Sequence, residues 1–222
     1  MAPVTDPQPE RATGPPTRVR LIGRAVNASV ARAPWLWPLL RRPTAGYFDE
    51  RAIDWDERTG APGAEHLAPL AVAVTKIDRR PERALDIGTG TGVAALFLAR
   101  EYPRASVRGV DISDEMIRLA KAKVGLDPEG RVAFRVADAA ALPYEDGSFD
   151  LVTQLNMPPF FAEIARVLRH DGHAIVAASA GDRTPFFTPD AVLRRGFERN
   201  GMVEVKADRV GGGSYFVARK ES

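Results

Sequence analysis

The chain has 222 residues, with 31 lysines and arginines against 29 aspartates and glutamates, a formal net charge of +2. It contains no cysteine, which excludes disulfides, cysteine–zinc sites, iron–sulfur clusters and a thiolate nucleophile. Three histidines disfavour a multi-histidine metal site, so we expect no metal. Hydrophobic residues make up 45% and charged residues 27%, a composition typical of a globular domain with a buried core.

The charge is distributed unevenly along the chain. Seven arginines and no acidic residue fall between Arg11 and Phe48, so the remaining residues carry 24 basic against 29 acidic side chains. We expect the proline-rich residues 1–17 to be disordered, because they hold too few apolar side chains to offset the entropy lost on ordering. Residues 18–80 are predicted to form a basic helical arm, and residues 81–222 the main domain.

The arm begins with apolar residues at helical spacing, flanked by arginines: Val19, Leu21, Ile22, Val26 and Val30. Trp35 and Trp37 follow among prolines. Two interpretations stay open: the arm packs on its own domain and buries its tryptophans, or it contacts a membrane surface or a partner protein. No stretch approaches the ~20 apolar residues of a membrane span, and we expect a cytoplasmic location.

Beyond the arm's first half, apolar runs of strand length alternate with segments of helical periodicity. Helices are predicted at 65–77, 92–101, 114–124, 159–168 and 189–200, and strands at 84–87, 106–110, 131–137, 149–155, 173–179, 202–208 and 214–219. This alternation predicts an α/β fold, a mostly parallel, doubly wound sheet with helices on both faces. Only Gly211–Gly213 separate the last two runs, too few residues for a crossover, so these strands should pair antiparallel.

A glycine-rich turn follows the first predicted strand in the segment ALDIGTGTGV, residues 84–93. Gly88, Gly90 and Gly92 permit a tight turn and a close approach of the backbone to a ligand. Val93 stands where a phosphate-binding P-loop would have Lys and where a dinucleotide fingerprint would have Gly or Ala. Asp86, just before the turn, would repel a pyrophosphate and attract an ammonium group. The loop therefore favours a cationic ligand.

Two more carboxylates stand at the ends of the next two predicted strands. Asp111, nineteen residues past Gly92, is placed to accept both hydroxyls of a ribose, and Ile112 beside it offers an apolar face to a base. Asp138 ends the third strand in the same way and is followed by the small Ala139. Each acid alone is equally typical of a helix cap or a turn. Together with the glycine loop, the three acids indicate a pocket for a cationic nucleoside with an amino group.

Three segments, ALDIGTGTGVAALFLAR, VRGVDISDEMIRLAKAK and VADAAALPYEDGSFDLV, resemble the successive motifs of class I S-adenosylmethionine-dependent methyltransferases. The resemblance runs from about residue 83 to residue 220 and implies a Rossmann-like seven-stranded sheet with one antiparallel strand. It implies S-adenosylmethionine as the cofactor and in-line methyl transfer to a small molecule as the activity. It also implies that the cofactor's methionine moiety is held by Asp86, Thr89 and the loop glycines, its ribose by Asp111, its adenine by Ile112, Met116, Asp138 and Ala139, and its amino group by carbonyls at Thr153–Gln154.

The acceptor side is predicted from residues 47–56, which resemble the aromatic–acid segment that folds over the cofactor in many small-molecule methyltransferases. Tyr47 and Trp55 are predicted to wall the methyl pocket, with Arg58 near the cofactor carboxylate. The alternative is that these aromatic rings only fasten the arm to the domain. His66, in the helix before the glycine loop, is a candidate general base, with a packing role as its alternative.

The segment Asn156-Met-Pro-Pro-Phe160 stands where amino-methyltransferases of nucleic-acid bases or protein glutamine carry Asn-Pro-Pro-aromatic. Met157 interrupts that motif and Asn156 comes one place late, and the prolines are also typical of a helix start. The acidic balance of the main domain also disfavours nucleic acid as a partner. The link between the strand predicted at 149–155 and the helix predicted at 159–168 is short and leaves few residues to shape an acceptor site. It motivates a second hypothesis, a cofactor-binding protein without transferase activity that engages a partner or membrane through its basic arm. The acceptor atom and the oligomeric state stay open.

Overall fold

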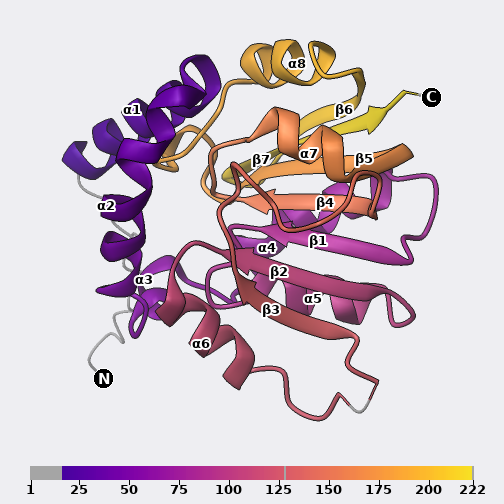
Figure 1. Ribbon diagram of the computed structural model, residues 1–222, viewed down its shortest axis with the longest axis horizontal. Helices are drawn as coiled ribbons and strands as arrows, with labels where there is room; N and C mark the ends of the chain where they lie inside the picture. Colours follow the sequence, from indigo (N-terminus) through magenta and orange to yellow (C-terminus); the bar gives the residue numbers. More distant parts are fainter. Residues whose placement is uncertain (1–16, 128, 222) are drawn as a thin grey trace, which may run out of the picture.

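The computed structural model of the protein describes residues 17–127 and 129–221 (Figure 1). Seven strands form one sheet in the order β3-β2-β1-β4-β5-β7-β6. The strands are β1 Arg83–Ile87, β2 Ser106–Asp111, β3 Val132–Val136, β4 Phe149–Leu155, β5 Leu168–Ala178, β6 Met202–Val210 and β7 Gly213–Lys220. The α-helices are α1 Thr17–Arg32, α2 Trp37–Asp49, α3 Trp55–Thr59, α4 Ala64–Ala73, α5 Val93–Glu101, α6 Asp114–Ala122, α7 Phe161–Val167 and α8 Asp190–Glu198.

The strand directions confirm the predicted doubly wound sheet. Strands β1 to β5 pair in parallel, whereas β7 pairs antiparallel with both β5 and β6. The β6–β7 connection consists of Gly211 and Gly212 alone, which is long enough for a hairpin and too short for a crossover. In the described part of the chain, no helix combines the length and apolar character needed to cross a membrane.

Several predicted boundaries need correction. Strand β5 begins at Leu168 rather than at residue 173, because Leu168 pairs with Phe149 of β4 across a shift in register. The helix predicted at 65–77 ends as α4 at Ala73 and continues as the 3₁₀ turn Val74–Lys76. The helix predicted at 159–168 is shorter, since α7 begins only after the two prolines of the preceding link.

Alternate residues of the strands face two hydrophobic cores, one on each side of the sheet. Leu85 and Val152 belong to the core under α7 and α8. Their chain neighbours Ala84 and Leu151 belong to the core under α4, α5 and α6. This follows from the two-residue period of an extended strand, and burial on both faces explains why the strands read as continuous apolar runs.

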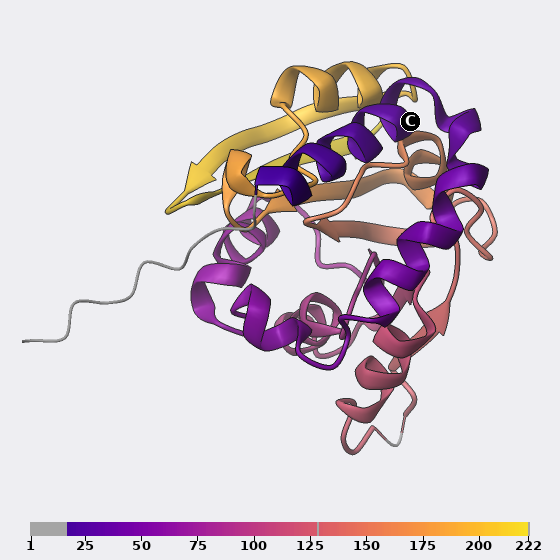
Figure 2. The ribbon, with the colours of Figure 1, turned by 90° about the vertical axis from the view of Figure 1, so that its left-hand side faces the viewer.

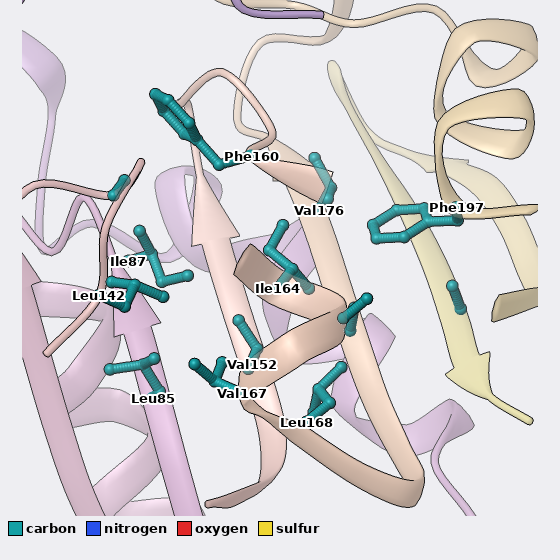
Figure 3. Close-up of a cluster of buried hydrophobic side chains, with 14 of the residues drawn as sticks. Leu85, Ile87, Leu142, Val152, Phe160, Ile164, Val167, Leu168, Val176 and Phe197 are labelled. Atoms are coloured by element: carbon teal, nitrogen blue, oxygen red, sulfur yellow. The ribbon is translucent and has the colours of Figure 1, made fainter. Parts of the chain in front are cut away.

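The core under α7 and α8 is drawn in Figure 3, where Ile164 of α7 and Phe197 of α8 are labelled with strand residues such as Val176. Ile164 is fully buried, and Phe197 is 1% exposed. Phe197 also lies edge to face with Phe161 at 5.0 Å between ring centroids. Each such side chain contributes roughly 1.5–3 kcal/mol through burial, so these helices are fixed firmly on the sheet.

The N-terminal arm lies across the end of the sheet at which β1 and β4 finish (Figures 1 and 2). Val30 of α1 and Trp37 of α2 are buried in the core under α7 and α8. Trp35, by contrast, is 74% exposed. The arm therefore packs on its own domain and buries one of these two tryptophans. Disorder was predicted for residues 1–17: residues 1–16 lie outside the described residues, and residue 17 begins α1.

Gly109 in β2 has no side chain, and the space beside it is occupied by the Phe134 ring of β3 and by Thr89 of the loop after β1. A Cβ atom there would lie 2.4 Å from the Phe134 ring of β3 and 2.8 Å from Thr89 Oγ1. We expect Gly109→Ala to lower the free energy of unfolding by about 1–3 kcal/mol, because the ring or the loop must move. Gly46→Ala in α2 is the control, since its Cβ meets nothing within 4 Å, and it should raise stability by up to about 1 kcal/mol. Urea unfolding measures both, and a Gly109→Ala protein as stable as the original would contradict this account.

Candidate cofactor and acceptor site

A pocket lies where β1, β2 and β4 end, with the arm and α4 on its other side. Its volume of about 1020 Å³ includes the open mouth and is therefore an upper bound on the space for a ligand. Ligands of open α/β sheets bind at this edge, outside the carboxyl ends of the strands. The sheet side of the pocket is lined by Ile87, Gly88, Thr89, Gly90, Thr91, Val110, Asp111, Ile112, Leu155 and Asn156.

The glycine loop is held against the end of β2 by backbone hydrogen bonds. The N–H groups of Gly88 and Thr89 donate to the Val110 carbonyl at 2.8 and 2.9 Å. Gly92, at the N-cap of α5, has a left-handed φ of 86°, and a Cβ there would lie 2.8 Å from the Phe134 ring. A side chain at this position would therefore be strained and would collide with the core, which explains the glycine that the sequence places there.

Asp111 faces the pocket beside this loop. Its Oδ2 accepts the Gly90 N–H at 2.9 Å and its Oδ1 accepts the Ser113 N–H at 3.0 Å. Burial raises the pKa of Asp111, although the backbone N–H bonds oppose this shift. Each carboxylate oxygen keeps a further lone pair, so the group can still accept two ligand hydroxyls, as predicted for a ribose. The predicted base contacts Ile112 and Met116 also line the pocket.

Asp86 lies beneath the loop and is 1% exposed. Its Oδ1 accepts a hydrogen bond from the Thr153 hydroxyl at 2.7 Å, and its Oδ2 has no partner among the described residues. Burial raises the pKa of this carboxyl to about 6. Thr89 Oγ1 and Gln154 Oε1 are likewise buried without a partner in that part of the chain. Thr89 lines the pocket, whereas Asp86 lies just behind the loop. A buried carboxylate with one oxygen unpaired fits a ligand that brings a positive charge and donors, such as an ammonium group.

Gln154 does not line the pocket. Its side chain is fully buried, and Nε2 donates to the Pro158 carbonyl at 3.3 Å. The predicted contact through carbonyls of this segment stays a prediction. Among residues 17–127 and 129–221, no three His, Asp or Glu side chains cluster as metal ligands.

Asp138 is engaged by the arm, a contact that the sequence did not reveal. Trp37 Nε1 donates to Asp138 Oδ1 at 2.7 Å, the Ala140 N–H donates to the same oxygen at 2.9 Å, and the Arg41 guanidinium lies 3.7 Å from Oδ2. Trp37 itself lines the pocket, as does Ala139, whereas Asp138 lies just behind them. The donors on Oδ1 fix the carboxylate and direct Oδ2 to other partners.

Two aspartates fasten the rest of the arm to the domain. Asp49, the last residue of α2, accepts hydrogen bonds from the Ser113 hydroxyl and the Glu115 N–H at the start of α6. Asp56 of α3 accepts from the Thr91 hydroxyl of the glycine loop and from Lys123 Nζ. The arm is therefore bonded to both elements that shape the sheet side of the pocket.

Of the residues predicted on the acceptor side, some line the pocket and others lie outside it. Trp55 and His66 line the pocket. Tyr47 lies outside it, with the Arg51 guanidinium 4.0 Å above its ring. The neighbouring Phe48 takes the place predicted for Tyr47 and packs edge to face on Trp55 at 5.3 Å.

Arg58, predicted near the cofactor carboxylate, is not among the pocket's lining residues and pairs at 3.4 Å with Asp54 of its own segment.

Asn156 lines the pocket, but its amide is already bonded. Nδ2 donates to Ser179 Oγ at 2.9 Å, and Oδ1 accepts the Ser179 N–H at 2.8 Å. The residue has a left-handed φ of 58° and ties the end of β4 to the end of β5. This arrangement disfavours the base-methylating hypothesis, because the amide is not free to hold a planar amino group.

The buried carboxyl of Asp86 makes the stability of the ligand-free protein depend on pH. Its pKa of about 6 lies above the ordinary aspartate value of 3.8, so the folded chain binds more protons than the unfolded chain between these values, and stability falls as pH rises from about 4 to about 6. We expect Asp86→Asn to remove this loss, worth at most about 3 kcal/mol at pH 7. Urea unfolding at about pH 4 and about pH 7, on the two sides of this fall, tests the expectation, and an equal pH dependence in both proteins would contradict it.

Known proteins share these motifs. A family model described as a methyltransferase domain matches residues 84–172. The ubiquinone/menaquinone biosynthesis C-methyltransferase UbiE of Geotalea uraniireducens is 38% identical over 114 residues, 47% of this chain and 48% of that protein. The malonyl-(acyl-carrier protein) O-methyltransferase of Geobacter sulfurreducens is 44% identical over 99 residues, 41% of this chain and 36% of that protein.

The fold is shared with solved structures as well. An S-adenosylmethionine-dependent methyltransferase from Aquifex aeolicus superposes with a TM-score of 0.59 at 19% identity, over 70% of this chain and 91% of that one. The chain spans less than half the length of the two curated relatives. The matched residues 84–172 contain the glycine loop, Asp86, Asp111 and Asp138. Residues 84–172 therefore match a methyltransferase domain, and the sheet around them has the fold of a solved S-adenosylmethionine-dependent methyltransferase.

Proposed function

We propose that this protein binds S-adenosylmethionine and transfers its methyl group to a small-molecule acceptor. The observation that carries the proposal is one pocket lined by the glycine loop and Asp111, with the unpaired Oδ2 of Asp86 buried beneath it. A molecule that joins a positively charged amino acid to a nucleoside brings two kinds of hydrogen-bond donor: ribose hydroxyls for Asp111 and an ammonium group for Asp86. The relatives' names, which refer to C- and O-methyltransferases, support the same class of reaction.

Each part of the cofactor has matching residues in this chain. Asp86 and the loop from Gly88 to Gly92 would hold the methionine end, where an ammonium group meets a buried carboxylate. Asp111 would accept the ribose hydroxyls. Ile112 and Met116 would pack on the adenine, and Asp138 would accept its amino group through Oδ2, while Trp37 and the Ala140 N–H hold Oδ1.

The arm supplies the conditions that methyl transfer needs. When bound, the cofactor contributes an electrophilic methyl group on a sulfonium. Trp37, Phe48 and Trp55 cover the pocket opposite the glycine loop, so they exclude water and leave a confined space for the acceptor. Orientation of two reactants in such a space supplies about 7–11 kcal/mol of rate enhancement. Confinement under the arm supports a small acceptor rather than a polymer.

The proposal is tested by titrating the protein with S-adenosylmethionine and then following methyl transfer from the labelled cofactor to fractions of a cell extract. We expect micromolar binding and label in a low-molecular-weight fraction. Binding without transfer to any fraction would favour the alternative, a cofactor-binding protein without transferase activity. Binding only in the millimolar range would refute both.

Asp111 is the residue whose loss should weaken cofactor binding most directly. We expect Asp111→Asn to raise the Kd for S-adenosylhomocysteine at least about 10-fold, since a charge-assisted hydrogen bond to a ribose hydroxyl is worth roughly 1.5–3 kcal/mol. Asp114→Asn is the matched control, because Asp114 is exposed in the first turn of α6 and should leave the Kd unchanged. Calorimetric titration distinguishes the two, and equal Kd values for both variants would remove Asp111 from the site.

Trp37 should affect cofactor binding through Asp138. Trp37→Phe keeps an aromatic ring against Phe160, which it meets edge to face at 5.1 Å, and removes the Nε1 donor to Asp138. We expect the Kd for S-adenosylhomocysteine to rise about 3- to 10-fold, the effect of one hydrogen bond of about 1 kcal/mol. Trp35→Phe, on the exposed neighbour, should leave the Kd unchanged. The same titration run with an analogue that lacks the adenine amino group should show no difference between Trp37→Phe and the original protein.

A further inference from the structure

We propose that His66 is the general base of this enzyme and that its acceptor is an uncharged, mostly apolar molecule methylated on a hydroxyl group. The inference rests on the proposed methyl transfer and names its acceptor class and its catalytic residue. It begins from the position of His66 on α4, where its side chain lines the pocket opposite the glycine loop.

The ring of His66 is held in one tautomer. Nδ1 lies 3.2 Å from the Thr59 carbonyl oxygen. A carbonyl oxygen only accepts hydrogen bonds, so Nδ1 carries the hydrogen, and in the neutral ring Nε2 keeps its lone pair. The contact with Thr59 thus leaves the basic Nε2 of His66, a residue that lines the pocket, without a hydrogen-bond partner among the described residues.

The surroundings of His66 keep the ring neutral near pH 7. Burial lowers its pKa below the usual 6.5, and this outweighs the opposing effects of the Thr59 carbonyl and the Asp56 carboxylate. Asp56 of α3 is itself paired with Lys123. Asp111, across the pocket, is the charged group on the sheet side. A neutral imidazole with an unprotonated Nε2 is the form that can remove a proton.

The other polar side chains around the acceptor space have their hydrogen bonds within the protein. Thr44 Oγ1 donates to the Leu40 carbonyl and Thr59 Oγ1 to the Trp55 carbonyl, both at 2.8 Å, and the Asn156 amide is bonded to Ser179. Trp55 Nε1 can only donate. Hydroxyl and amide oxygens are not basic enough to remove a proton, so of the described lining residues other than Asp111, which is proposed to hold the ribose, His66 is the one that offers a base.

The remaining surface of the acceptor space is apolar and carries no charged side chain among the described lining residues: Val26, Phe48, Ala61, Leu155, Met157, Phe160 and Phe186. An ammonium or carboxylate group on the acceptor would be desolvated there without a partner, which costs several kcal/mol. A hydroxyl group on an apolar body meets both features of the space, because its proton faces a base and the rest of the molecule faces aromatic and aliphatic side chains.

Methyl transfer to the hydroxyl group replaces one bond to the methyl carbon by another and releases one proton. The hydroxyl oxygen forms a bond to the methyl carbon, the bond between that carbon and the sulfonium sulfur breaks, and its electron pair remains on sulfur in S-adenosylhomocysteine. The hydroxyl proton passes to Nε2 of His66. The resulting imidazolium keeps its Nδ1–H on the Thr59 carbonyl and lies near the Asp56 carboxylate, which favours the charged form until the proton leaves to solvent.

His66→Asn tests the base, because the asparagine amide can still donate to the Thr59 carbonyl but has no basic nitrogen. His170→Asn is the matched control: its Nδ1 also contacts a carbonyl, that of Glu221 at 3.0 Å, but the residue is exposed and outside the pocket. The probes are apolar phenols of graded acidity, with matched aryl amines and carboxylic acids. We expect His66→Asn to slow single-turnover methylation of weakly acidic phenols about 10²–10³-fold and to change the cofactor Kd less than about 2-fold.

The dependence on acidity separates a base from a structural residue. The loss caused by His66→Asn should shrink as the phenol becomes more acidic, since an ionised phenol needs no base. In the original protein, the single-turnover rate at saturating cofactor should fall on acidification with a midpoint below 6.5, and this step should be absent in His66→Asn. The pH profile of the unaltered protein tests the inference without any substitution, and saturation with cofactor removes the effect of Asp86 on binding.

Two results would overturn this inference and leave the proposed function intact: normal cofactor binding with transfer to amines or carboxylic acids but to no phenol, or equal rates for His66→Asn and His170→Asn across the phenol series. Failure of the original protein to bind the cofactor would instead refute the proposed function itself.

Discussion

The glycine loop after β1 depends on its attachment to the end of β2, and the rest of the site depends on that loop. Two backbone N–H groups donate to one carbonyl, that of Val110, and a third donates to the side chain of Asp111. The loop can lie this close only because Gly109 and Gly92 leave room for the Phe134 ring. One contact region therefore fixes the start of α5 and the orientation of the carboxylate proposed to hold the ribose.

The site keeps polar groups in places that lower the stability of the ligand-free chain. Asp86 is buried with one oxygen unpaired, and Thr89 and Gln154 have unpaired buried oxygens beside it. Each such group destabilises the fold by about 1–3 kcal/mol until a donor reaches it. The two hydrophobic cores offset this, since α7 and α8 on one side and α4 to α6 on the other fix the strands whose ends carry these groups.

The cofactor half of the site could be predicted from the sequence because its signals are local. A strand, a glycine turn and a helix follow one another within residues 84–101, and Asp111 and Asp138 come directly after strands, so chain order and sheet topology together place them at one edge. The other half depends on contacts that no local pattern encodes. Trp37 meets Asp138 across 101 positions of sequence. Tyr47 and Phe48 are neighbours on a helix, separated by about 100° around its axis, and only packing decides that Phe48 faces the pocket.

The arm's hydrogen bonds to the domain have a consequence for folding and for the ligand pocket. Asn27 of α1 donates to Thr188 across 161 positions, and Trp37 of α2 donates to Asp138 across 101 positions, so α1 and α2 gain these partners only once the strands between them have been synthesised. Contacts of such long sequence separation slow folding, and because Val30 and Trp37 are buried in the core under α7 and α8, the arm cannot leave without exposing part of that core. Arm docking therefore belongs to the cooperative folding of the domain, so the wall that the arm gives to the ligand pocket forms only when the core forms.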